Sequence, residues 1–168
     1  MFLSSGLLVL FNKICYNERM KAVIQRVDGA TLSVGGEVVS SIGRGLVVYV
    51  GIEQADVEAN IVAFAQKLVA MRIFPDGDGK LNLSVRDVGG SILLVSNFTL
   101  CADISHGNRP SFTNAMRPAV QASSFFDYCV NVVTDCMRGS AGSVESGVFG
   151  ADMIIDQVND GPITIIYG

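Results

Sequence analysis

The sequence predicts a single α/β domain in which strands outnumber helices. Short runs of alternating or continuous apolar residues recur along the chain, as they do in strands that are half or fully buried. Two longer segments instead repeat apolar residues every three or four positions, the spacing of a helix that packs one face on a core. The 168 residues contain no internal repeat and no linker-like tract, so one domain of ordinary size is expected.

The strands are identified by β-branched and aliphatic runs bounded by glycine or polar residues. The pair Gly35-Gly36 separates two such runs and marks a two-residue hairpin turn. The last expected strand is unusual because it begins on Pro162, which has no N–H for a ladder. In chain order, the expected strands cover residues 21–27, 30–34, 37–42, 45–52, 91–98, 143–149, 151–158 and 162–167.

Two helices are expected between these strands. Apolar residues spaced by three and four run from Val57 to Met71, with Asp56 as the N-cap. A second set runs from Ala122 to Cys136 and ends at Gly139. Two helices are enough to cover one side of the sheet.

Composition and charge limit the function classes. The chain is 49% apolar and 17% charged, which is typical of a globular protein. Its net charge of −4 argues against a protein that holds long nucleic acids through its overall field, but leaves room for a local contact with an RNA end. Four cysteines without a CxxC spacing and a single histidine predict no metal site.

The domain is expected to cover residues 20–168, with residues 1–19 as an N-terminal extension whose role the sequence does not indicate. The apolar run from Phe2 to Phe11 is too short to cross a membrane. From Met20 onward the sequence changes to strand alternation, which sets the domain boundary.

Polar residues interrupt apolar strands at two places, "SNFTL" (96–100) and "NDGP" (159–162). A strand that ends in a loop exposes backbone N–H groups, and neighbouring hydroxyls help them to bind an anion or oxyanion. The alternative is that Ser96 and Thr99 only complete hydrogen bonds at a strand end. His106, in a Gly/Asn-rich loop, is interpreted as a solvated histidine, with a catalytic base as the alternative.

The order of five motifs resembles that of the D-aminoacyl-tRNA deacylases, over essentially all of residues 20–168. The resemblance implies a three-layer α/β domain with a strongly curved, barrel-like mixed sheet. It also implies a cytoplasmic homodimer without a cofactor or metal, with no membrane or DNA partner. The activity implied is hydrolysis of the ester that joins a D-amino acid, or glycine, to the terminal adenosine of tRNA. The motifs are "MKAVIQRV" (20–27), "SNFTL" (96–100), "GNRPSF" (107–112), "GVFGADM" (147–153) and "NDGPIT" (159–164).

By this resemblance the catalytic group is Ser96, Asn97, Phe98 and Thr99, with backbone N–H groups around Phe98 and Thr99 as oxyanion donors. Relatives carry glutamine where this chain has Asn97, so a side-chain role there is open. Thr99 either attacks the ester or positions it, and no adjacent base is visible to activate an attack.

The same resemblance assigns substrate binding to six residues. Gly161-Pro162, expected as a cis peptide, would reach into the partner subunit's pocket and reject L-amino acids. Arg26 would brace that dipeptide, or form a surface salt bridge instead. Phe149 would stack on the terminal adenine, or be a core aromatic, with Ala151 and Met153 beside it. Two rival functions remain: a deacylase for tRNA carrying a wrong L-amino acid, and an inactive dimer that binds RNA ends.

Overall fold

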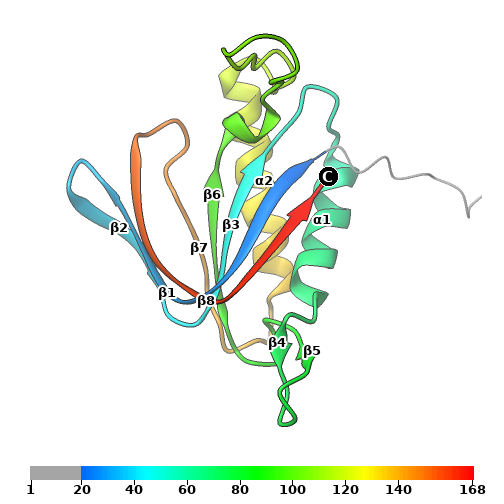
Figure 1. The fold of residues 1–168 in the computed structure, drawn as a ribbon, viewed down its shortest axis with the longest axis vertical. Helices are drawn as coiled ribbons and strands as arrows, with labels where there is room; N and C mark the ends of the chain where they lie inside the picture. Colours follow the sequence, from blue (N-terminus) through cyan, green and yellow to red (C-terminus); the bar gives the residue numbers. More distant parts are fainter. Residues whose placement is uncertain (1–19) are drawn as a thin grey trace, which may run out of the picture.

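The computed structural model describes residues 20–168, and the expected extension 1–19 lies outside them. Eight strands, two α-helices and one 3-10 helix make up a single α/β domain (Figure 1). In chain order they are β1 (Lys21–Val34), β2 (Glu37–Ile42), β3 (Gly45–Gly51), α1 (Glu58–Ala70), β4 (Phe74–Pro75), β5 (Leu81–Leu83), β6 (Ser91–Ser96), η1 (Phe98–Cys101), α2 (Ala119–Cys136), β7 (Val144–Ser146) and β8 (Met153–Tyr167).

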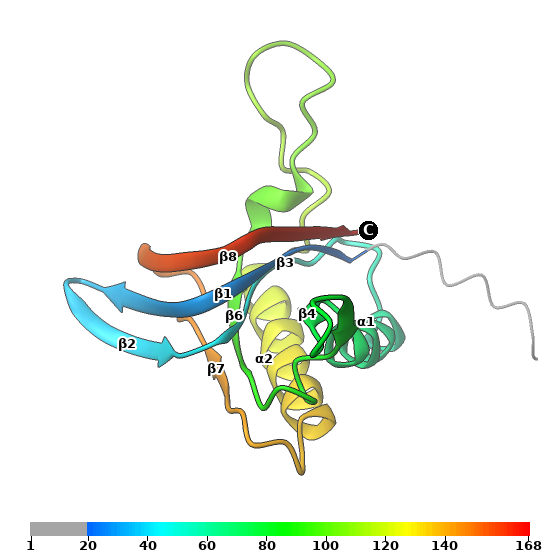
Figure 2. The same ribbon diagram turned by 60° about the horizontal axis from the view of Figure 1, so that its bottom comes forward.

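The main sheet is mixed and strongly curved, as the family resemblance implies. Its order is β2-β1-β3-β6-β7, with β8 on the other side of β1. The pairs β3–β6 and β6–β7 are parallel, and the others are antiparallel. Along one edge, β1 pairs first with β3 through residues 21–27 and then with β2 through residues 30–34. This change of partner lets the sheet curl back on itself (Figure 2).

The curled sheet and the helices form three layers with two apolar cores. The larger core lies between the sheet and the two helices, and includes Phe64, Phe74 and Phe126, all almost fully buried. The smaller one fills the inside of the curl, where Leu32 and Ile42 face Leu93. Both helices therefore cover one face, as expected, while the other face closes on itself.

Two pairs of expected strands are continuous in the structure. Residues 21–27 and 30–34 join into β1, and residues 151–158 and 162–167 join into β8. Register shifts between Gln25 and Gly29 absorb the irregular residues, so the ladder between β1 and β8 continues past them. Gly161-Pro162 therefore lies inside a strand, and the expected start of a strand at Pro162 is wrong. A bulge tolerates a proline that a regular central ladder excludes.

Other element ends move by a few residues. The expected strand 143–149 is reduced to β7, and the strand 91–98 ends at Ser96. Asp56 is not the N-cap of α1: the helix is capped by Val57, whose N–H donates to Asn60 Oδ1 at 2.9 Å. The Asp56 carboxylate instead accepts from the Glu53 N–H at 2.6 Å, which closes the turn before the helix.

A small hairpin, β4–β5, was not expected from the sequence. Its connecting loop is organised by Asp76, whose carboxylate accepts from the N–H groups of Asp78 and Lys80 and from the Asn82 side chain. These bonds lower the pKa of Asp76, first through Asn82. Among residues 20–168, no three histidine, cysteine or acidic side chains are grouped as metal ligands. No helix in this range is long and apolar enough to span a membrane.

Candidate active site

A single large pocket brings together segments that are far apart in the sequence. Its volume is about 1120 Å³, above the roughly 300–1,000 Å³ of common small-molecule pockets. Three walls surround it: residues 95–99 at the end of β6, residues 112–122 leading into α2, and residues 149–155 leading into β8. Tyr49 of β3 completes the lining. Most of the lining is apolar, and the polar groups are concentrated on the first wall.

All four residues of the expected catalytic group lie on that first wall. Ser96 is the last residue of β6, and η1 begins two residues later at Phe98. The turn between them is fixed because the Asn97 N–H donates to Val50 O at 2.8 Å. The Asn97 side chain caps η1, since its Oδ1 accepts from the Thr99 N–H at 3.3 Å and from the Thr99 hydroxyl.

These bonds define what the turn offers to a substrate. An amide oxygen is not a base, so Asn97 orients the Thr99 hydroxyl without activating it for attack. The Thr99 N–H is already engaged with Asn97, which differs from its expected role as a free oxyanion donor. The Phe98 N–H has no hydrogen-bond partner within residues 20–168, and so it is the donor that the turn leaves available.

Phe98 itself is unusual for a large apolar side chain, with 59% of its surface exposed. It packs edge-to-face on Phe112, with ring centroids 5.1 Å apart. Phe112 also lines the pocket, although its role was not expected. It ends the "GNRPSF" motif, so the motif itself was the signal that could have identified it.

The three residues expected to bind the nucleoside, Phe149, Ala151 and Met153, lie together on the third wall. Phe149 also packs against the larger core, with its ring centroid 6.2 Å from that of Phe126. The core interpretation of Phe149 is therefore confirmed, while its stacking on an adenine stays a prediction that its place in the pocket lining allows.

Sequence patterns did not indicate the remaining polar lining residues, Tyr49, Arg117 and Asp152. Burial raises the pKa of Tyr49, so it remains a neutral phenol whose hydroxyl donates to Gln157 Oε1 at 3.1 Å. Tyr49 lies in a run of aliphatic residues, and Arg117 lies in a stretch that is read as loop. Asp152 belongs to the motif GVFGADM and to the expected strand 151–158, but nothing singled it out. Arg117 and Asp152 are the charged members of the lining.

Gly161, Pro162 and Arg26 do not reach this pocket within one chain. The peptide bond Gly161-Pro162 is cis, as expected, and both residues are exposed on β8. Residues 160–163 lie opposite the single residue Arg26, because Gln25 pairs with Thr164 and Val27 pairs with Asn159. We call this segment, residues 160–163, the Gly-Pro bulge.

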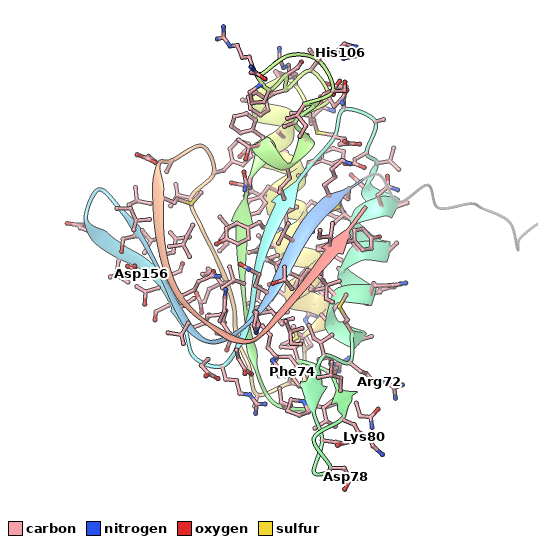
Figure 3. The ribbon with its side chains drawn as sticks, in the orientation of Figure 1. Arg72, Phe74, Asp78, Lys80, His106 and Asp156 are labelled. Atoms are coloured by element: carbon pink, nitrogen blue, oxygen red, sulfur yellow. The ribbon has the colours of Figure 1, made fainter. Side chains whose placement is uncertain are left out.

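Arg26 supports the Gly-Pro bulge from behind, and its ion pair is not the surface salt bridge considered as the alternative. Its side chain is only 8% exposed, and Nε lies 2.8 Å from Asp160 Oδ2. Its Nη1 donates to Ile73 O at 2.7 Å, and its guanidinium lies 5.8 Å from the centroid of the Phe74 ring. Figure 3 shows Phe74 in the lower part of the domain, at the opposite end from the loop that carries His106.

Two other groups, the candidate base His106 and the thiol of Cys101, lie outside the pocket. His106 is exposed on its loop, where Nδ1 lies 2.7 Å from Ser105 Oγ, consistent with a solvated histidine. Cys101 ends η1 and is buried, and this burial raises the pKa of its thiol to about 11. The thiol therefore stays protonated at neutral pH and does not serve as a nucleophile.

The fold and the pocket together define a small α/β protein with a large, mostly apolar site and a polar turn at one wall. Comparison with known proteins identifies the family. The model of the family described as D-Tyr-tRNA(Tyr) deacylase matches residues 23–168. This chain belongs to that family, as the sequence motifs predicted.

Individual relatives agree with this assignment. The chain is 48% identical over 147 residues to the D-aminoacyl-tRNA deacylase of Chlorobaculum parvum, covering 88% of this chain and 96% of the relative. It is 49% identical over 147 residues to the enzyme of the same name from Carboxydothermus hydrogenoformans, covering 88% and 98%. A solved structure described as the c-Myc DNA Unwinding Element Binding Protein is 39% identical, with a TM-score of 0.80 over 87% of this chain and 96% of the other.

Another solved structure, described as a probable eukaryotic D-amino acid tRNA deacylase, shares the fold with a TM-score of 0.73. The match covers 88% of this chain and 97% of the other chain, and the two sequences are 18% identical.

Proposed function

We propose that this chain hydrolyses the ester bond of D-aminoacyl-tRNA, and of glycyl-tRNA, releasing the free amino acid and the tRNA. The domain responsible is residues 20–168, and the setting is translation quality control in the cytoplasm. The observation that carries the proposal is the polar turn from Ser96 to Thr99, which opens into a pocket large enough for a nucleoside and an amino acid. Family membership supports the same reaction.

The chemistry needs little from the protein, because an aminoacyl ester is already activated. Water attacks the ester carbonyl, and the oxygen of that carbonyl gains negative charge as the tetrahedral intermediate forms. The Phe98 N–H would donate to this oxyanion, and one such donor is typically worth about 2.7–4 kcal/mol. The Thr99 hydroxyl, held by Asn97, would position the ester. The adenine would lie against Phe149 on the third wall.

The active unit in this proposal is a homodimer, because the Gly-Pro bulge points out of its own chain. β8 is 15 residues long and pairs only with β1 among the strands of residues 20–168, so its other edge is open. Its outer face also carries exposed Ile154, Val158 and Ile166, at 65%, 63% and 77%. Open strand edges and apolar faces of this kind are covered by partners in stable proteins.

In the dimer, the bulge would enter the partner subunit's pocket and select the configuration of the amino acid. Gly161 has φ +119° and no Cβ, so backbone atoms can approach a ligand closely. If carbonyl oxygens of this segment hold the substrate's amino group, the side chain of an L-residue is driven into backbone. A D-residue points away, and glycine has no side chain to clash.

Deacylation of D-Tyr-tRNA and L-Tyr-tRNA by the pure protein tests this function. We expect release of D-tyrosine at least about 100-fold faster than release of L-tyrosine, since backbone clashes are hard to relieve. Preferential hydrolysis of the L-ester would instead support the deacylase for wrong L-amino acids. Binding of tRNA ends without turnover would support the inactive dimer. Binding of duplex DNA in place of either would point to the activity named for the 39% identical relative.

A further inference from the structure

Arg117 holds the positive charge of the pocket, and nothing in the reaction described above uses it. It lies on the second wall, two residues before the start of α2, and its side chain is exposed. The ion pairs formed within residues 20–168 join Lys21 to Glu53, Arg26 to Asp160 and Arg138 to Asp135. Arg117 takes part in none of them, so its guanidinium is available to a ligand.

The backbone that carries Arg117 is fixed, although its side chain is free. The Arg117 N–H donates to Gln54 Oε1 at 2.9 Å, and the preceding Met116 N–H donates to Ile52 O at 2.9 Å. Gln54 is held in turn, because its N–H donates to Asn114 O at 2.8 Å. These bonds tie the second wall to the end of β3, and so the arginine starts from a defined position at the pocket.

The other charged residue of the lining lies on a different wall. Asp152 belongs to the third wall, beside Ala151 and Met153, where the adenine is proposed to lie. A negative ligand group is therefore repelled from the third wall and attracted to the second. The first wall offers the Asn97 and Thr99 groups, which are neutral. Arg117 is thus the one cationic side chain in the lining of the pocket.

A nucleotide at an RNA 3′ end has three chemical parts to accommodate: a base, an esterified ribose and a 5′-phosphate. The proposed function uses the third wall for the base and the first wall for the ester. Given this function, we infer that Arg117 binds the 5′-phosphate of the terminal nucleotide. The guanidinium suits this task because its planar fork of N–H donors matches two phosphate oxygens at once.

This contact explains how an acidic chain holds an anionic substrate. With a net charge of −4, the protein as a whole repels RNA, so the attraction has to be local. One arginine at the pocket gives that attraction at the terminal phosphate, where it also sets the position of the ester relative to Phe98. The interaction is partly solvated, and it weakens as salt is added.

Two small esters that differ only in the phosphate test the inference. The first is adenosine carrying D-tyrosine on its 3′-hydroxyl, and the second is the same ester of adenosine 5′-monophosphate. We expect wild-type kcat/KM to be about tenfold higher for the phosphorylated ester, the size of one charge-assisted contact. In Arg117→Gln the ratio should fall to near one, and in Arg117→Lys it should be intermediate. Arg138→Gln, at an exposed position just after the end of α2, should keep the wild-type ratio.

The outcomes separate this inference from the proposed function. If wild type hydrolyses both esters with a ratio near one, or if Arg117→Gln keeps the tenfold ratio, the phosphate contact is wrong and the function stands. If wild type hydrolyses neither ester and also leaves D-Tyr-tRNA intact, the proposed function is wrong. Calorimetric binding of adenosine 5′-monophosphate against adenosine then decides the contact alone: tighter binding of the monophosphate that is lost in Arg117→Gln supports it, and equal binding overturns it.

Discussion

The pocket and the Gly-Pro bulge are built in opposite ways, although the proposed site needs both. The pocket is concave, and its three walls come from segments up to 60 residues apart, roughly the span from residue 95 to residue 155. The bulge is an exposed projection on one strand, supported from behind by one buried arginine. A concave site can be completed inside one chain, whereas a projection acts only on something outside it.

The largest expected effect comes from adding one methyl group to the bulge, Gly161→Ala. The new Cβ would lie 2.9 Å from Ile163 N and 3.0 Å from its Cγ1, at a φ of +119°. The backbone has to shift, and a shift of about 1 Å at a positioning group costs about 100-fold in rate. We expect D-Tyr-tRNA turnover to fall by at least that factor, measured with purified dimer.

Gly36→Ala is the matched control for this variant. Gly36 also has positive φ, +87°, but a Cβ there meets no atom within 4 Å. Both substitutions should lower the free energy of unfolding by about 1–2 kcal/mol because of backbone strain. Only Gly161→Ala should lose activity. Full activity and selectivity in Gly161→Ala would mean that the bulge is only a structural irregularity of β8.

A smaller effect, mainly on stability, is expected from Arg26→Met. The substitution removes the partner of Asp160 and of Ile73 O, and breaking a buried pair costs about 3–5 kcal/mol. Because Asp160 is 30% exposed, we expect the free energy of unfolding, measured in urea, to fall by about 2–3 kcal/mol. Because the bulge loses its support, the preference for D- over L-Tyr-tRNA should also narrow.

Arg138→Met provides the comparison, since Arg138 and Asp135 form an exposed pair, at 80% and 62%. Loss of this ion pair should change the free energy of unfolding by no more than about 0.5 kcal/mol. An Arg26→Met protein that keeps both its stability and its selectivity would show that the bulge is rigid without the arginine.

The smallest expected effect lies in the pocket, at Thr99. If its hydroxyl only positions the ester, Thr99→Val should slow deacylation about tenfold, and Thr99→Ser should retain most of the rate. Asn97→Ala should give a similar loss, because it frees the same hydroxyl. Mass spectrometry of a quenched reaction decides the point: a trapped aminoacyl-Thr99 adduct would make Thr99 the nucleophile instead.

Element types were predictable from the sequence because their apolar periodicities are clear. The helices and the buried strands β3 and β6 lie where the patterns place them. Whether a strand continues past an irregular residue was less predictable. The glycines and the proline at Asp28-Gly29 and Gly161-Pro162 locally indicate the end of a strand. The ladder between β1 and β8 carries the chain through both points, and this pairing joins residues more than 100 positions apart.

The expected site residues came from motifs, and the structure brings seven of them to one pocket. Their roles remain predictions. Tyr49 and Arg117 were missed because a lining residue is defined by what faces it across a cavity, which no local pattern records. Phe112 was missed although it belongs to the motif GNRPSF. The hydrogen bond between Asn97 and Thr99 was equally hidden, since it depends on the turn that η1 imposes.

The place of the Gly-Pro bulge inside β8 affects how fast the bulge can change its conformation. Surface loops exchange conformations in nanoseconds to microseconds, whereas residues within a hydrogen-bonded ladder move only when the ladder opens. Residues on both sides of the bulge remain paired with β1. A selectivity element held in this way presents the same shape to every arriving substrate. The frequency with which an L-amino acid is accepted would then depend on how often β1 and β8 separate. It would rise steeply only at temperatures at which this separation becomes common.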